Sequence, residues 1–201
     1  YMEYDYGTTQ SNVVPYLGSG GGPSAYSIPL TGKLATSWVF VSFPSATSGA
    51  IQTILNDAAA GDGGTVWTVA KWLNIQTPAD PWKTFRVGST VNDLLTINNT
   101  MGVWLWITAN GGDQKLTMNT YAANSSVNVI IDLKAGWNMV GYPTATSRTE
   151  LATLPAAADL VATWQLASPY ITQHVKGATL MVPGNAYWIH CTADTQWIVA
   201  P

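Results

Sequence analysis

The sequence contains one pattern twice, and this repeat constrains the fold more than any other feature. Residues 38–48 read Trp-Val-Phe-Val-Ser-Phe-Pro-Ser-Ala-Thr-Ser, and residues 137–147 read Trp-Asn-Met-Val-Gly-Tyr-Pro-Thr-Ala-Thr-Ser. The segments after each copy correspond in the same order, and an internal repeat fixes the architecture before single residues are interpreted. We therefore expect two tandem pseudo-symmetric units, residues 24–124 and 125–201, after an N-terminal arm or linker, residues 1–23.

Each unit reads as two strands, a short helix, two strands, a turn and two strands. The predicted fold class is therefore β-rich α+β, with mostly antiparallel strands and one short helix in each unit. Residues 38–43 and 137–142 are apolar on both faces, which predicts a central strand that is covered on both sides. Ser147 and Glu150 have the spacing of a capping box, and Ser48 is expected to cap the equivalent helix, residues 50–59.

The last long strand of each unit has two different faces. Val103, Leu105 and Ile107 share one face of the first copy, and the second copy matches them with another apolar row, so this face is expected to be core. The other face is rich in indole rings. Trp67 and Trp82 can enlarge this surface, for which the candidate residues are Trp104, Trp106, Trp188, His190, Trp67 and Trp82. Such a face can pack between layers or repeats, stack on sugar rings, or make contacts in an assembly.

The strands between the helix and the last long strand are matched by their aromatic residues. Val66-Trp67 is paired with Thr163-Trp164, and Pro81-Trp82 is paired with Pro169-Tyr170. This alignment predicts that Trp67 and Trp164 occupy corresponding positions in the two units.

Charge is the unusual part of the composition. Charged residues make up 9% of the chain, against roughly 25% in an ordinary soluble domain. Such a surface is typical of an extracellular protein or of a subunit buried among copies of itself. The net charge is −3 without a basic cluster, which argues against nucleic-acid binding. No apolar run reaches the roughly 18 residues of a membrane span.

The N-terminal arm has its own pattern. Tyr1, Tyr4 and Tyr6 alternate with polar residues as in a short strand, and a glycine-rich linker follows at residues 18–23. The arm is either a remnant of a preceding domain or a strand donated to a neighbouring subunit. Because the chain begins at Tyr1, we expect it to be a processed piece of a longer protein.

The second copy resembles a known family. Gly136-Trp137-Asn138-Met139-Val140-Gly141-Tyr142-Pro143 is similar to the "GWN" motif of repeat domains in secreted, cell-surface proteins of archaea and some bacteria. In that family a Val-Trp, a Trp-Lys and a Gly-Tyr-Trp-Ile strand follow, and the similar segments here are Thr163-Trp164, Pro81-Trp82-Lys83, Asn185-Ala186-Tyr187-Trp188-Ile189 and Gly102-Val103-Trp104-Leu105. The resemblance covers about residues 24–201, although Ser37-Trp38-Val39 departs from it. It implies an extracellular module and supplies no catalytic residues.

Catalytic candidates are few. His190 and Cys191 are neighbours, but neighbours in a strand point to opposite faces, and they correspond to Trp106 and Ile107 of the first copy. Cys191 is therefore expected to be a buried apolar side chain, and as the one cysteine it forms no disulfide within the chain. Glu3 and Glu150 are the only glutamates, so the sequence does not predict the carboxylate pair of a glycoside hydrolase.

Candidates for metal binding and modification are also few. His174 is the only other histidine, which leaves no zinc spacing. Asn56, Asp57 and Asp62 offer oxygen atoms to calcium without the spacing of a calcium loop, so a polar helix end and turn are expected. No metal or cofactor is predicted. The sequons at Asn98 and Asn124 fall in predicted turns, where a glycan can be attached.

Together these features predict a non-enzymatic, secreted structural module of a cell-surface layer, filament or adhesin. Its expected partners are copies of itself or other surface proteins. Two alternatives stay open. One is a carbohydrate-binding module that binds glycans through exposed tryptophan and tyrosine, and the other is an accessory domain of a secreted hydrolase.

Overall fold

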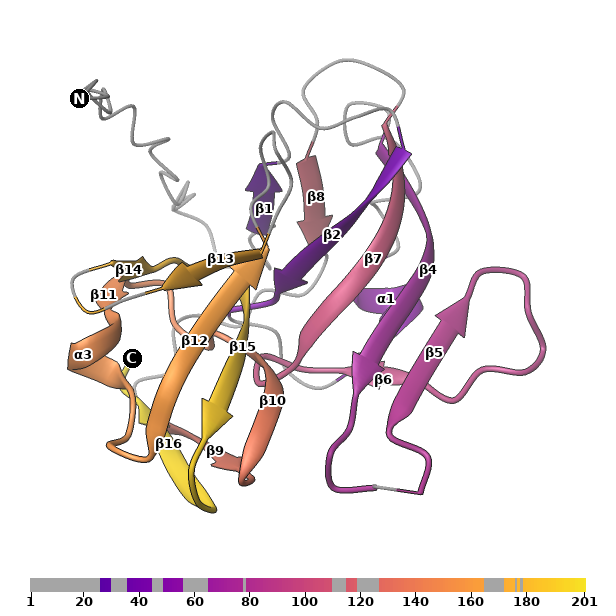
Figure 1. Ribbon diagram of the computed structural model, residues 1–201. Helices are drawn as coiled ribbons and strands as arrows, with labels where there is room; N and C mark the ends of the chain where they lie inside the picture. Colours follow the sequence, from indigo (N-terminus) through magenta and orange to yellow (C-terminus); the bar gives the residue numbers. More distant parts are fainter. Residues whose placement is uncertain are drawn as a thin grey trace, which may run out of the picture.

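The computed structural model describes residues 26–29, 36–44, 49–55, 65–77, 79–109, 115–118, 127–164, 172–175, 177 and 179–201 (Figure 1). Over this part of the chain the protein is β-rich, and its paired strands are antiparallel. Each described helix has four residues, and neither is long or apolar enough to cross a membrane. The predicted N-terminal arm, with Tyr1, Tyr4 and Tyr6, lies outside the described residues.

Two four-stranded sheets form the body of the molecule (Figure 1). Sheet 1 has the order β2-β7-β4-β5, with the strands β2 (Thr36–Ser42), β4 (Thr65–Leu73), β5 (Trp82–Arg86) and β7 (Gly102–Ala109). Sheet 2 has the order β10-β15-β12-β13, with the strands β10 (Gly136–Gly141), β12 (Ala158–Trp164), β13 (Thr172–Val175) and β15 (Ala186–Cys191). In both sheets the strand that comes last in the sequence, β7 or β15, lies second in the order, between the two strands that come first in the sequence.

Four two-stranded sheets complete the described β-structure. Their strands are β1 (Tyr26–Pro29) with β8 (Lys115–Met118), β3 (Gly49–Ala50) with β6 (Thr96–Ile97), β9 (Val129–Leu133) with β16 (Thr195–Val199), and β11 (Arg148–Thr149) with β14 (Leu180–Met181). Helix α1 (Ile51–Ile54) follows β3, and helix α3 (Glu150–Thr153) follows β11.

Each sheet has its own core. Because side chains alternate along a strand, one face of β7 buries Val103, Leu105 and Ile107 with no exposed area, together with Val39 and Val41 of β2. The corresponding face of β15 is buried with the second core, whose members include Tyr187, Ile189, Cys191, Val140, Tyr142 and Trp197. The predicted core face of the last long strand is therefore confirmed.

A third cluster lies between the two sheets. Its buried members are Phe40, Met139 and Ala186, and the residues packed against them are Trp72, Leu73, Trp104, Trp164 and Trp188. Phe40 and Met139 stand opposite Trp104 and Trp188 in their sheets. The indole-rich faces of the two sheets therefore meet in the centre of the molecule.

The two sheets also meet through reciprocal backbone contacts. Val41 forms a β-bridge with Asn185, and Met101 forms one with Val140. Each strand end adds a hydrogen bond, from the N–H of Ser42 to the Gly184 carbonyl at 2.8 Å and from the N–H of Gly141 to the Thr100 carbonyl at 2.9 Å. The end of β2 thus contacts the segment before β15, and the end of β10 contacts the segment before β7.

This arrangement corrects one prediction. The tryptophan-bearing strands β2 and β10 are edge strands of their sheets rather than central ones. Their second apolar face is nevertheless covered near the middle of the molecule, since Phe40 and Met139 are 1% and 3% exposed. The other sheet provides that cover, which is why both faces are apolar in an edge strand.

Both described helices also differ from the prediction. Helix α1 begins after Ala50, which makes no side-chain cap hydrogen bond, and it ends at Ile54 with Leu55 as its C-cap, whereas residues 56–59 of the predicted helix lie outside the described residues. Helix α3 begins only at Glu150, because Arg148 and Thr149 are extended and pair with β14. Ser147 is therefore not the N-cap residue of α3. Ser48 lies outside the described residues.

The strand registers correct the alignment of the two units. A bulge falls between Trp67 and Val69 in β4 and between Ala158 and Leu160 in β12. Relative to these bulges, Trp67 has the position of Ala158 rather than that of Trp164. The alignment of Trp67 with Trp164 is therefore wrong, because Trp164 lies at the far end of its strand, where it packs between the sheets.

Candidate functional site

The six aromatic residues predicted for a surface do not lie together. Trp67 is 3% exposed and belongs to the first core. Its Nε1 donates a hydrogen bond to the Leu55 carbonyl at 2.8 Å, and its ring lies 5.7 Å from that of Phe85. Trp67 therefore attaches the end of α1 to sheet 1 and does not face solvent.

Trp104 and Trp188 pack between the sheets. The Trp104 ring stacks on Phe40 with centroids 4.7 Å apart, and it meets Trp164 edge-on at 5.4 Å. Trp188 lies 6.0 Å from the same Phe40 ring. These contacts correspond to the packing alternative that the sequence left open for this face.

Trp106 lies farther out on sheet 1, where it contacts Trp38 of the neighbouring strand at 5.2 Å. The Lys71 Nζ lies 5.9 Å from the Trp38 ring centroid, a cation–π contact. Val69 stands opposite Trp106, and Arg86 opposite Val69. We call Trp38, Val69, Lys71, Arg86 and Trp106 the basic patch.

His190 lies at the corresponding place on sheet 2, opposite Trp137 on one side and Leu160 on the other. Its ring meets Trp137 at 5.2 Å, and its Nδ1 lies 2.6 Å from the Asp159 Oδ1. This hydrogen bond lowers the pKa of the Asp159 carboxyl. Trp137 and Leu160 are 42% and 43% exposed. We call Trp137, Asp159, Leu160 and His190 the acidic patch.

Most residues of the two patches were missed by sequence reasoning. Trp106 and His190 were predicted as surface residues, but Asp159, Leu160 and Lys71 come from neighbouring strands and join only through the sheet register. The repeated Trp38 and Trp137 were the available signal, since both lie near the start of an edge strand, opposite Trp106 and His190.

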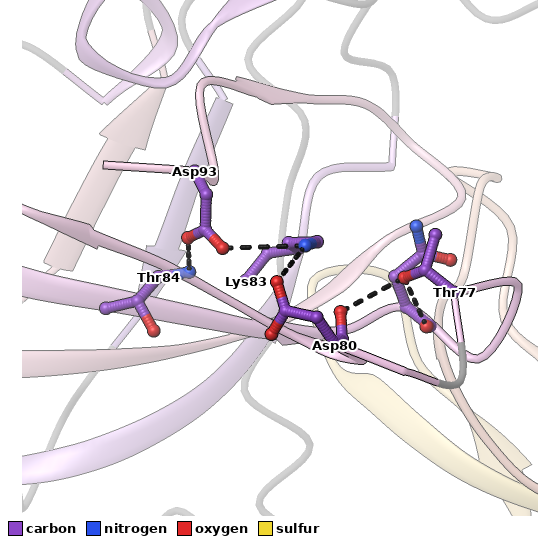
Figure 2. A network of polar contacts seen from close by, with 6 residues as sticks. Thr77, Asp80, Lys83, Thr84 and Asp93 are labelled. Carbon is purple, nitrogen blue, oxygen red and sulfur yellow. Dashed lines mark hydrogen bonds and ion pairs between the residues drawn. The ribbon is translucent and has the colours of Figure 1, made fainter. Parts of the chain in front are cut away.

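Trp82 is 45% exposed at the start of β5, and the next residue in the sequence, Lys83, belongs to a polar network. Figure 2 shows Lys83 between two carboxylates, with its Nζ 2.6 Å from Asp80 Oδ2 and 3.5 Å from Asp93 Oδ2. Asp93 also accepts a hydrogen bond from the Thr84 N–H at 2.6 Å. The hydrogen bond with Asp80 is the main cause that raises the pKa of Lys83. These contacts hold the β4–β5 and β5–β6 connections together.

A cleft of about 280 Å³ lies where the two units meet. Trp72, Ile75 and Thr100 line it from the first unit, and Ile130 and Met139 line it from the second. Asn138 also reaches this cleft, but four hydrogen bonds to backbone groups already engage its amide.

His190 and Cys191 point to opposite faces of β15, as predicted. Cys191 is 1% exposed within the second core, where burial raises the pKa of its thiol. The hydrolase alternative needs an acid–base pair, and His190 with Asp159 is such a pair by distance. The side chains that flank it, Trp137 and Leu160, carry no nucleophile.

The remaining candidates fall into two groups. Asn98 lies in a turn, where its Oδ1 accepts hydrogen bonds from the N–H and the hydroxyl of Thr100. His174 lies on β13 opposite Ala162. The candidates outside the described residues are Asn56, Asp57, Asp62 and Asn124. Within the described part of the chain, no three His, Cys, Asp or Glu side chains are grouped to hold a metal ion.

No known protein family, curated protein sequence or solved structure matches this chain.

Proposed function

We propose that this chain is a non-enzymatic structural module of a secreted or cell-surface assembly, such as a surface layer, a filament or an adhesin. Its partners are copies of itself or other surface proteins. The low charge supports this proposal, because a chain with 9% charged residues has little charge repulsion to keep its copies apart.

One observation carries the proposal. The outer end of the indole-rich face of sheet 2 is open and apolar, with Trp137 42% and Leu160 43% exposed. These two side chains flank His190 on one sheet face, and exposed apolar patches are typical of protein–protein contact sites. Tryptophan is also among the residues that contribute most to binding free energy at such sites.

We further propose that residues 24–124 and 125–201 are two copies of one unit, related to the "GWN" repeat domains. The equal strand order of the two sheets and the bulges in β4 and β12 support this. So do the reciprocal contacts of Val41 with Asn185 and of Val140 with Met101. Contacts in which each copy presents the same surface to the other are typical of two-fold interfaces.

Sedimentation velocity of the full chain over a wide concentration range tests self-association. We expect the sedimentation coefficient to rise with concentration above that of a monomer. A monomer coefficient at every concentration, with no assembly by electron microscopy, would contradict the proposal.

The exposure of two indole rings supports carbohydrate binding as a second candidate. Trp82 and Trp137 are 45% and 42% exposed, so each offers part of a ring to a sugar. We expect a glycan that binds to change the tryptophan emission, and Trp82→Ala or Trp137→Ala to remove that change. If no member of a glycan panel alters the emission of the wild-type protein, this candidate is wrong.

A further inference from the structure

The indole-rich faces of the two sheets cover each other only in part. Phe40 and Met139 lie in the cluster between the sheets. Trp38 and Trp137 lie two residues earlier on the same faces of β2 and β10, outside that cluster. Among the described residues, each sheet therefore has one end that the other sheet covers and one open end, and the basic and acidic patches occupy the open ends.

The open ends lie on opposite sides of the molecule. Strands β2 and β10 run inward from opposite ends and finish at the contact between the sheets (Figure 1). Trp38 and Trp137 each precede that contact by three residues, which corresponds to about 10 Å of strand. The two patches are therefore separated by the whole width of the contact between the sheets.

The patches match in shape and differ in charge. Each has a tryptophan on the edge strand, a second aromatic ring opposite it, and a branched aliphatic side chain on the third strand, Val69 or Leu160. The basic patch adds Lys71 and Arg86, both exposed, and within the described residues neither has a carboxylate partner. The acidic patch adds the carboxylate of Asp159, whose Oδ1 is hydrogen-bonded to His190 within the same patch.

From this complementarity we propose that the partner at each open end is a second copy of this chain. The basic patch of one copy docks on the acidic patch of the next. The tryptophan and aliphatic side chains provide the apolar contact, while Lys71 and Arg86 face Asp159. This inference rests on the self-association proposed above and assigns its interface.

The consequence is head-to-tail assembly. A contact between two different patches leaves one patch of each kind free at the ends, so it propagates into an open chain or closes into a ring. A contact between two identical patches would stop at a dimer. It would also place like charges together, which is unfavourable in an interface.

Changing the charge of each patch tests this proposal. One variant reverses the basic charges with Lys71→Glu and Arg86→Glu, and the other adds a positive charge beside Asp159 with Leu160→Lys. We call these two the reversed variants. All three sites are exposed, so the fold is expected to be kept, which circular dichroism and thermal unfolding check. The control is Val91→Lys, at a side chain that is 88% exposed outside both patches.

We expect each reversed variant alone to associate at least about tenfold more weakly than wild type, because like charges then meet in the interface. The Val91→Lys control should associate as wild type does. Mixing the two reversed variants should restore association, because every contact in the mixture can again pair opposite charges. Sedimentation velocity of the separate and mixed proteins measures this.

Other outcomes overturn the inference in different ways. Loss of association in only one of the two variants would show a contact between identical patches. Unchanged association in both would place the interface elsewhere and leave the proposed self-association standing. A wild-type protein that stays monomeric at every concentration would contradict the proposed function itself.

Discussion

Asn138 is a buried amide that closes the turn between β9 and β10. Its Oδ1 accepts the Lys134 N–H at 2.8 Å, and its Nδ2 donates to the carbonyls of Lys134, Gly136 and Ile189 at 2.8, 3.0 and 3.2 Å. Gly136 within this turn has a φ of +93°, which favours glycine. Asn138 therefore has a structural role in the second unit, and β2 has Val39 at the corresponding position.

Replacing Asn138 is expected to cost stability. Asn138→Ala leaves the Lys134 N–H and three carbonyls without this partner, so the free energy of unfolding should fall by about 1–3 kcal/mol. Urea unfolding measures the change. Asn99→Ala, at a half-buried amide in a turn, is the matched control and should stay within about 0.5 kcal/mol of wild type. Equal effects of the two substitutions would contradict the role assigned to Asn138.

The ion pair of Lys134 and Asp194 makes stability depend on pH. The Lys134 Nζ lies 2.8 Å from Asp194 Oδ2, and the Ala135 N–H donates to Asp194 Oδ1. The hydrogen bond with Lys134 lowers the pKa of Asp194 below its ordinary value of 3.8. The same contact raises the pKa of Lys134 above 10.5. The pair therefore stabilises the fold at pH values between the lowered pKa of Asp194 and the raised pKa of Lys134.

Asp194→Asn should remove this contribution. The difference in unfolding free energy between wild type and variant should be constant between about pH 5 and 9. It should shrink as the pH falls below 3.8, because wild-type Asp194 is then protonated through its lowered pKa. It should shrink again above pH 10.5 as Lys134 loses its proton. For Lys134→Gln, the difference in unfolding free energy from wild type should shrink at low pH in the same way. A difference that persists at low pH would contradict the role assigned to this ion pair.

Strands β7 and β10 approach each other closely because of two glycines. A Cβ on Gly102 would lie 2.5 Å from the Val140 carbonyl oxygen and 2.9 Å from the Ala186 Cβ. A Cβ on Gly141 would lie 2.6 Å from the Asn99 carbonyl oxygen. These contacts are with backbone and a short side chain, which cannot move away without shifting a strand.

Gly102→Ala is therefore expected to weaken the contact between the two sheets. The loss of unfolding free energy should exceed the value of about 1–2 kcal/mol that a residue with a Cβ costs in the left-handed conformation alone. Gly88→Ala supplies that reference, because Gly88 has a φ of +80° and a Cβ added there would meet no neighbouring atom within 4 Å. Thermal unfolding and amide exchange at the Gly141 N–H measure the two variants. A smaller loss for Gly102→Ala than for Gly88→Ala would contradict the close-packing account.

The faces of the strands were predictable, while their places in the sheets were not. Alternation alone assigned Val103, Leu105 and Ile107 to the core, since a strand's two faces can be read from its sequence. Apolar residues on both faces of β2 suggested a central strand, whereas the second face is covered by the other sheet. Which element provides the cover is a tertiary fact that the pattern within one strand does not contain.

The candidate site was predictable to a similar extent. The repeat identified Trp106 and His190 as corresponding positions, and the sheets place them opposite Trp38 and Trp137. The charges of the patches were not foreseen, because Lys71 and Asp159 join these rings from another strand. That contact depends on the register and on the bulge beside Asp159.

At the scale of the whole molecule, the two sheets are held together by an apolar cluster and by reciprocal strand-end contacts. This arrangement leaves two open ends of opposite charge on opposite sides. A molecule with two different complementary ends is suited to extended assembly, which agrees with the self-association proposed for it.

Electron microscopy of the concentrated protein tests this central claim most directly. The account predicts filaments, rings or layers in which the copies are joined end to end, and it predicts that Leu160→Lys reduces them to isolated particles. Isolated wild-type particles at every concentration would contradict it.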